Sequence, residues 1–155
     1  ANVNGIQNTA IGDNALSSVT SNGNTALGYQ AGSNLTAAAN NIIIGYQAEA
    51  SAVTAQNQIV IGKGAVGVAD NSVVIGNSSI VKTILKGSVG VGVDDPQSKL
   101  QVDGGIQLAD DSDTASASKV GTFRYRTSGN NSYVDMCMQT GATTYVWVNI
   151  VQNNW

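Results

Sequence analysis

The sequence contains no histidine, a single cysteine (Cys137), a single proline (Pro96) and a single glutamate (Glu49) among its 155 residues. The lack of histidine excludes a Ser-His-Asp triad and histidine-based metal sites. One cysteine cannot form an internal disulfide, so no cysteine framework organises the fold. Charged residues make up only 11% of the chain and aromatic residues 5%. We therefore expect no metal, no cofactor and no enzymatic activity.

Charge and hydropathy narrow the class of protein further. The net charge is −3 at pH 7, which argues against non-specific binding to nucleic acid or to an anionic membrane. No apolar run is long enough to cross a bilayer, so we expect no membrane insertion. Hydrophobic residues reach 42% of the chain, and their periodic pattern of valine and isoleucine favours ordered structure over disorder.

A short motif recurs along the first part of the chain. It consists of a polar residue, an apolar tripeptide and a glycine, and the closing glycines are 14 to 17 residues apart. A small residue follows three positions after most of these glycines, as at Ala15, Ala31 and Ala48. A repeat of this length with one short strand is typical of a β-solenoid or β-roll. The six copies are Asn8–Gly12, Asn24–Gly28, Asn41–Gly45, Gln58–Gly62, Ser72–Gly76 and Ser88–Gly92.

Both faces of each tripeptide are apolar. Its first and third residues are β-branched or leucine, and we expect this side to form the stacked interior of the coil. The middle residue lies on the other side, and a strand that is apolar on both faces is buried on both. We therefore expect the middle residues to meet other copies of the chain at a symmetry axis, most simply in a homotrimer. The alternative is a monomeric solenoid with an exposed apolar sheet. The expected axis residues are Ala10, Ala26, Ile43, Val60, Val74 and Gly90.

The repeat [Asn/Ser]-x-[Ala/Val]-[Ile/Val]-Gly-x-x-[Ala/Ser] resembles the left-handed β-roll heads of trimeric autotransporter adhesins and the same repeat in bacteriophage tail fibres. A second block also resembles tail fibres, where it lies between the shaft and a terminal β-domain. It has glycine-valine repeats followed by Pro-x-x-Lys-Leu-x-Val-x-Gly-x-Ile, matched by Pro96, Lys99, Leu100, Val102, Gly104 and Ile106.

This resemblance implies a trimeric tail-fibre module located on a virion. Its partners would be other copies of itself, other virion tail proteins, and a host-surface glycan or outer-membrane receptor. The alternative is the head of a bacterial trimeric autotransporter adhesin, located at the cell surface. A third possibility is a capsule depolymerase that uses carboxylates in the expected turns, such as Asp94, Asp95, Asp103 and the Asp110–Asp113 group.

We expect an all-β chain with three regions: a β-roll shaft over residues 1–92, a β-hairpin connector over 93–118 and an antiparallel β-domain over 119–155. The connector hairpin would pair Lys99–Val102 with Ile106–Leu108. Tyr29 and Tyr46 occupy equivalent positions after consecutive glycines, so their rings should stack across neighbouring coils.

Three strands are expected in the last region, at Thr122–Thr127, Tyr133–Gln139 and Thr144–Val151. One side would carry Phe123, Tyr125, Val134 and Met136 and form the core. The other side mixes aromatic rings with hydrogen-bond donors, which suits stacking on sugars but also suits a subunit interface. The candidate receptor-binding residues, with the terminal tryptophan added, are Arg124, Arg126, Tyr133, Tyr145, Trp147 and Trp155.

Overall fold

A computed structural model describes residues 5–153, and the side chains of residues 5–151. Trp155 therefore lies outside the described part. Over these residues the secondary structure consists of β-strands and one short 3-10 helix, which confirms the all-β class. The chain forms two compact units, of which the first ends at Ile84 and the second begins at Leu85. In the described residues no helix has the length and apolarity needed to span a membrane.

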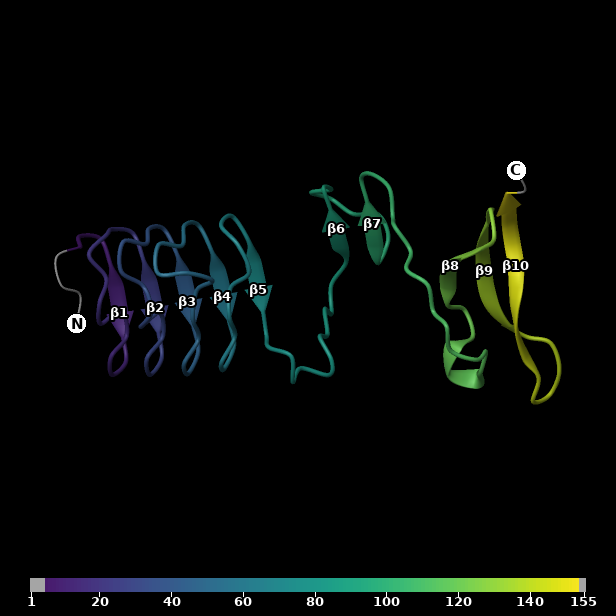
Figure 1. The fold of residues 1–155 in the computed structure, drawn as a ribbon, viewed down its shortest axis with the longest axis horizontal. Coiled ribbons are helices and arrows are strands. Elements are labelled where there is room, and N and C mark those ends of the chain that lie inside the picture. The colour runs from purple at the N-terminus through teal and green to yellow at the C-terminus, as the bar shows by residue number, and fades with distance from the viewer. Residues whose placement is uncertain (1–4, 154–155) are drawn as a thin grey trace. The chain divides into compact units, whose positions relative to one another are not determined.

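The first unit is a β-solenoid, as the repeat predicts. Five short strands lie side by side in one parallel sheet in the order of the sequence (Figure 1). Equivalent residues of successive repeats are paired, so that Ile43 lies between Ala26 and Val60. The strands are β1 (Thr9–Ile11), β2 (Thr25–Leu27), β3 (Ile42–Ile44), β4 (Ile59–Ile61) and β5 (Val73–Ile75).

The glycine that closes each strand is required by the stacking of the coils. Gly45 has a φ of +138°, and a Cβ at this position would lie 2.4 Å from the carbonyl oxygen of Gly62 in the next coil. A side chain there would collide with the backbone, and the positive φ disfavours any residue other than glycine. The regular glycine at Gly12, Gly28 and Gly45 therefore marks a corner where the backbones of neighbouring coils approach closely.

The polar residue that precedes each strand forms a buried ladder of amides. The Oδ1 of Asn24 accepts a hydrogen bond from the backbone N–H of Asn41, and the Oδ1 of Asn41 accepts one from the N–H of Gln58, at 3.1 and 3.0 Å. The Nδ2 of Asn41 also donates to the carbonyl of Ala55 at 2.8 Å. Because Asn24, Asn41 and Gln58 are fully buried, these bonds satisfy backbone groups that water cannot reach.

The expected orientation of the strands is wrong. Ala26, Ile43 and Val60, assigned above to a symmetry axis, are fully buried within the single chain. They pack in the coil interior with the alanines that follow the glycines, such as Ala31 and Ala48. These alanines share the interior with larger side chains such as Leu16 and Leu35.

The other three expected axis residues differ from these in burial. Ala10 is exposed on the first strand, Val74 is half-buried, and Gly90 is exposed outside this sheet. The first and third residues of the strands, expected inside the coil, instead point outward. Ile11, Val73 and Ile75 are 59%, 62% and 65% exposed.

The sixth repeat does not continue the solenoid sheet. Its strand β6 (Val89–Val91) pairs in parallel with β7 (Leu100–Val102) in a separate two-stranded sheet of the second unit. The expected hairpin between 99–102 and 106–108 is also wrong, because the latter residues form no strand. Ser72, which precedes β5, takes the place of the ladder amide, and its hydroxyl donates to the carbonyl of Ala69 in its own loop.

The C-terminal sheet is an antiparallel meander, as predicted. It is formed by β8 (Phe123–Ser128), β9 (Asn131–Gln139) and β10 (Tyr145–Asn153), with β9 in the centre, and the 3-10 helix η1 (Ala117–Lys119) precedes it. The register shifts between Asn149 and Val151, so Val151 rather than Ile150 pairs with Val134. This bulge moves Val151 to the apolar face of the sheet.

A candidate recognition site on the C-terminal sheet

Residues 109–121, here called the strap, run across the arginine-bearing face of the C-terminal sheet. The backbone carbonyl of Asp111 accepts a hydrogen bond from Nη1 of Arg124, and that of Asp113 accepts one from the indole N–H of Trp147, at 2.7 and 3.0 Å. Lys119 closes the strap on itself, because its Nζ lies 2.6 Å from Asp111 and 3.0 Å from Asp113. The strap therefore covers the face that the sequence assigns to a receptor.

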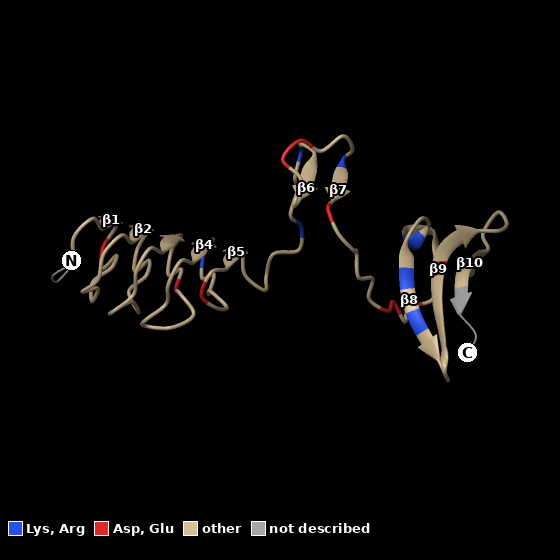
Figure 2. Ribbon diagram, turned by 90° about the horizontal axis from the view of Figure 1, so that it is seen from above, with Lys and Arg blue, Asp and Glu red and all other residues tan. Residues whose placement is uncertain are grey.

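A buried carboxylate organises this face. Asp135 on β9 is fully buried, and its Oδ2 accepts hydrogen bonds from Nε of Arg124 at 3.0 Å and from Nε of Arg126 at 2.6 Å. Its Oδ1 accepts a third from the side-chain amide of Asn149 at 3.2 Å. The cross-strand pairing of β8 with β9 places Arg124 directly opposite Asp135. Figure 2 shows the basic residues concentrated on β8, with few charges on the solenoid strands.

The charged groups adjust one another's proton affinity. Burial by itself would raise the pKa of Asp135, but hydrogen bonds from Arg126, Asn149 and Arg124 outweigh it and leave the pKa below its usual value. The hydrogen bond from Lys119 lowers the pKa of Asp111, and the same contact raises the pKa of Lys119. All of these groups are therefore charged at neutral pH, and each has a partner of opposite sign.

The aromatic rings of this face are stacked against the arginines. The guanidinium of Arg124 lies 4.1 Å from the ring centroid of Trp147, and that of Arg126 lies 3.9 Å from that of Tyr133. One face of each ring is thus occupied by a cation, a favourable contact in itself. A sugar could stack only on the opposite face of either ring.

The structure brings five of the six candidate receptor residues onto one face of the sheet. Arg124, Arg126, Tyr133 and Trp147 are joined by ion pairs, ring contacts and the strap. Tyr145 is half-buried and pairs with Gln139 in the ladder of β9 and β10. Of the five described candidates it is the one whose side chain forms no hydrogen bond, ion pair or ring contact within the described residues.

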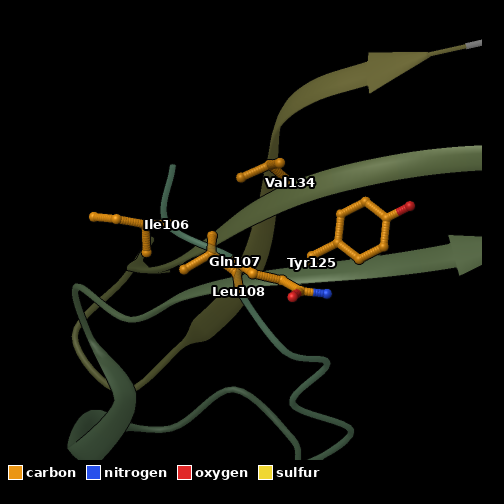
Figure 3. A pocket seen from close by; sticks show the side chains of 5 residues that line it. All are labelled: Ile106, Gln107, Leu108, Tyr125 and Val134. Carbon is orange, nitrogen blue, oxygen red and sulfur yellow. The ribbon is translucent and has the colours of Figure 1, made fainter. Parts of the chain in front are cut away.

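The opposite face of the sheet, expected to be the core, is apolar and open in the single chain. Phe123 and Met138 are exposed, and Met136 is only half-buried. Where this face meets residues 106–108 it is hollowed by a cavity of about 380 Å³. Figure 3 shows Ile106, Gln107, Leu108, Tyr125 and Val134 around this hollow. The lining residues are mostly apolar, and none of them is a buried ionisable group.

The expected alternation of the strands places Asp135 on this face, but sequence reasoning missed its ion pairs with the arginines and the strap. The acidic run at 110–113 is expected as a solvated turn or a carboxylate site, yet Asp111 and Asp113 are paired with Lys119. The alternation of Arg124, Arg126 and Asp135 on adjacent expected strands is the signal that could have located the ion-pair cluster. No group of histidine, cysteine, aspartate or glutamate side chains in the described residues could hold a metal ion.

The solenoid carries one further predicted contact. The rings of Tyr29 and Tyr46 are stacked with centroids 5.2 Å apart and an interplanar angle of 22°, which confirms the predicted tyrosine pair. The next amides along the chain follow the same pattern, since Nε2 of Gln47 donates to Oε1 of Gln30 at 2.9 Å. Both contacts join solvent-facing side chains at equivalent positions of neighbouring coils.

No family model, curated protein sequence or solved structure matches this chain.

Proposed function

We propose that this chain is the structural and host-recognition module of a homotrimeric fibre, of the kind found in bacteriophage tail fibres and located on the virion. The solenoid serves as the shaft, and the C-terminal sheet serves as the terminal domain. The sequence resemblance supports the fibre type, and the solenoid fold is the architecture that a shaft of this type requires. Three copies of a weak recognition site on one rigid fibre bind cooperatively through effective concentration.

The apolar side chains on the outward face of the solenoid sheet are the observation that supports a trimer. The aligned register stacks the first residues of the strands in one row and the third residues in a second row. Both rows are apolar apart from Thr9 and Thr25, and Ile11, Val73 and Ile75 are mostly exposed to water in the single chain. A continuous apolar strip along a sheet marks an interaction surface.

The dimensions of this face suit three copies. Residues two apart on a strand are separated by about 7 Å, so each face is a narrow strip two side chains wide. Three such strips can close around an axis and exclude water from one another. The contact residues of the proposed trimer are therefore the outward ones: Thr9, Ile11, Thr25, Leu27, Ile42, Ile44, Ile59, Ile61, Val73 and Ile75.

The molecular mass in solution tests the assembly. Light scattering should give three times the 15.8 kDa of one chain. Leu27→Asp places a charge in the strip and should shift the mass to that of one chain. Ala37→Asp is the matched control, since Ala37 is exposed in a loop away from the strands. A single-chain mass for the unsubstituted protein, or an unchanged mass for Leu27→Asp, would contradict the proposed trimer.

Recognition is tested separately from assembly. We propose that Tyr145 contacts a glycan of the host surface, because its ring is not engaged with another described side chain. On a glycan array the trimer should bind a defined set of sugars, and Tyr145→Ala should weaken this binding at least tenfold. Thr143→Ala, an exposed position in the adjacent loop, is the control. If no sugar binds, or if both variants bind equally well, the proposed glycan site at Tyr145 fails and the shaft role stands alone.

A further inference from the structure

Residues 85–108, here called the linker segment, lack an apolar core. They contain β6, β7 and the apolar residues Leu85, Val91, Leu100 and Ile106, all of which are exposed. From Leu85 to Val134 no residue is buried in the single chain. By contrast, the solenoid has a continuous buried cluster of its own, which includes Leu16, Leu35 and Ile43. The two parts of the chain thus differ in what can hold them folded.

The sheet formed by β6 and β7 is too small to be stable by itself. Its strands have three residues each, and flanking backbone bonds run from Val89 N to Lys99 O and from Asp103 N to Val91 O, both at 2.9 Å. Isolated two-stranded sheets are marginal in water, and parallel sheets are almost always covered on both faces. Some other surface must therefore cover this one.

The side chains of this small sheet show which face needs the cover. Val89 pairs with Leu100 and Val91 with Val102, so four apolar side chains share one face, while Gly90 and Gln101 lie on the other. Val91 and Leu100 are 52% and 58% exposed. Val89 and Val102 are half-buried, so the apolar side of this small sheet is open to water along both strands.

The charges of the segment identify the cover as a second copy of the same chain. Lys86 and Lys99 lie in the segment with Asp94, Asp95 and Asp103, and none of these five forms an ion pair within the described residues. A surface that carries both signs and an apolar strip is complementary to itself, because another copy supplies partners for each charge as well as apolar area.

We propose that the linker segments of the three copies cover one another through the apolar face of the β6–β7 sheet. The segment then acquires stable structure only on assembly, whereas the solenoid folds within one chain. This inference rests on the trimer proposed above. It adds that the solenoid folds first, within one chain, and the linker segment afterwards, on assembly. Coupled folding and binding of this kind makes the structure of the segment depend on protein concentration.

Limited proteolysis of the full chain measures this dependence. Trypsin can cut after Lys86 and Lys99 in the linker segment, and after Lys63 in the solenoid and Arg124 in the C-terminal sheet as internal controls. At concentrations where light scattering shows a trimer, both linker sites should resist cleavage. Dilution into the single-chain range should speed cleavage at these sites by at least tenfold, while cleavage after Lys63 changes little.

A pair of substitutions on one strand assigns the protection to the apolar face. Leu100→Thr removes an apolar side chain from that face, and Gln101→Thr places the same residue on the other face. Leu100→Thr should speed cleavage after Lys86, which is not adjacent in sequence to either substitution, by at least tenfold at the trimer concentration. Gln101→Thr should change it less than threefold.

Failure of this inference is distinguishable from failure of the trimer. A trimer whose linker sites are cut equally fast at every concentration overturns the inference and leaves the trimer intact. Linker sites that resist trypsin in a single-chain species overturn it as well, because the segment would then fold without a partner. A single-chain mass at all concentrations removes the trimer itself. Equal effects of the two threonine substitutions would show that the apolar face is not the contact.

Discussion

Replacing Asp135 with asparagine removes one negative charge from the face beneath the strap and preserves the size of the side chain. The carboxylate holds two guanidinium groups, with its Oδ2 3.0 Å from Nε of Arg124 and 2.6 Å from Nε of Arg126. An amide oxygen can still accept one of these bonds, but it does not neutralise two adjacent cations. The new amide N–H₂ group would also face donors rather than acceptors.

The magnitude follows from the burial of the three groups. Removing one partner of a buried ion pair costs about 3–5 kcal/mol, because the remaining charge is left uncompensated. The side chain of Arg124 is only 12% exposed, whereas that of Arg126 is 30% exposed and recovers part of its hydration. We therefore expect Asp135→Asn to lower the free energy of unfolding of the second unit by about 3 kcal/mol, or roughly 15 °C in Tm for a unit of this size.

Tryptophan fluorescence isolates the unit in which this change occurs. Trp147 and Trp155 are the only tryptophans in the sequence, and both follow the solenoid. Thermal and urea unfolding monitored by tryptophan emission should shift for Asp135→Asn. Asp110→Asn makes the same chemical change at an exposed position of the strap and should shift stability by less than about 0.5 kcal/mol. Equal midpoints for the two variants would refute the stabilising role of the ion-pair cluster.

Acid titration gives the same prediction a second readout. The pKa of Asp135 is lower in the folded protein than in the unfolded chain, because the bonds from Arg126, Asn149 and Arg124 outweigh burial. The stability that this shift provides is present above the unfolded value of about 3.9 and is lost as pH falls through the folded value. The unsubstituted protein should therefore lose stability below about pH 4 more steeply than Asp135→Asn. Parallel acid profiles would contradict the assignment.

Three further predictions concern the solenoid and the strap. Gly45→Ala should destabilise the solenoid by about 3–5 kcal/mol in circular dichroism melts, because its Cβ would meet the next coil, whereas Gly64→Ala meets only a distant amide and should cost about 1 kcal/mol. Asn41→Ala removes the amide that donates to the carbonyl of Ala55 and accepts from the N–H of Gln58. It should lower the free energy of unfolding of the solenoid by about 3 kcal/mol in the same assay. Gln56→Ala is its control and should be near neutral, because the exposed Gln56 side chain forms no hydrogen bond within residues 5–153. Contact with Asp111 raises the pKa of Lys119, so the strap contact should persist below the unfolded value of about 10.4 and weaken as pH rises through the folded value. Tryptophan emission should then shift to the red in the unsubstituted protein and stay constant in Lys119→Arg.

Local rules predicted most of the strands of this chain from its sequence. The spacing of the glycines predicts six solenoid strands, of which five form the parallel sheet, because a repeat of short apolar strands has few folds other than a stack of coils. The alternation and turn residues after Gly121 predict the meander of β8, β9 and β10, apart from the bulge before Val151. The pairing of Tyr29 with Tyr46 follows from their equivalent positions in neighbouring repeats.

The hydrophobic pattern did not predict which face of each solenoid strand is buried. Alternation divides Ile42, Ile43 and Ile44 between two faces, yet both faces are apolar, so the sequence does not show which one is enclosed. The alanine that recurs after the first four glycines held the missing information, since Ala31 and Ala48 share the interior with Ile43. The middle residues of β2, β3 and β4 join these alanines in the buried cluster, and the first and third residues of the same strands stay outside it.

The sequence by itself determined the class of fold, the period of the coils and the positions of the strands, because these depend on residues that are close along the chain. Only the tertiary structure decided which face of each strand became the core and where the sixth repeat found its partner. It also decided that Asp135 and the strap engage the arginines and Trp147. These outcomes depend on contacts between residues far apart in sequence, whose free energies are compared only when the whole chain is folded.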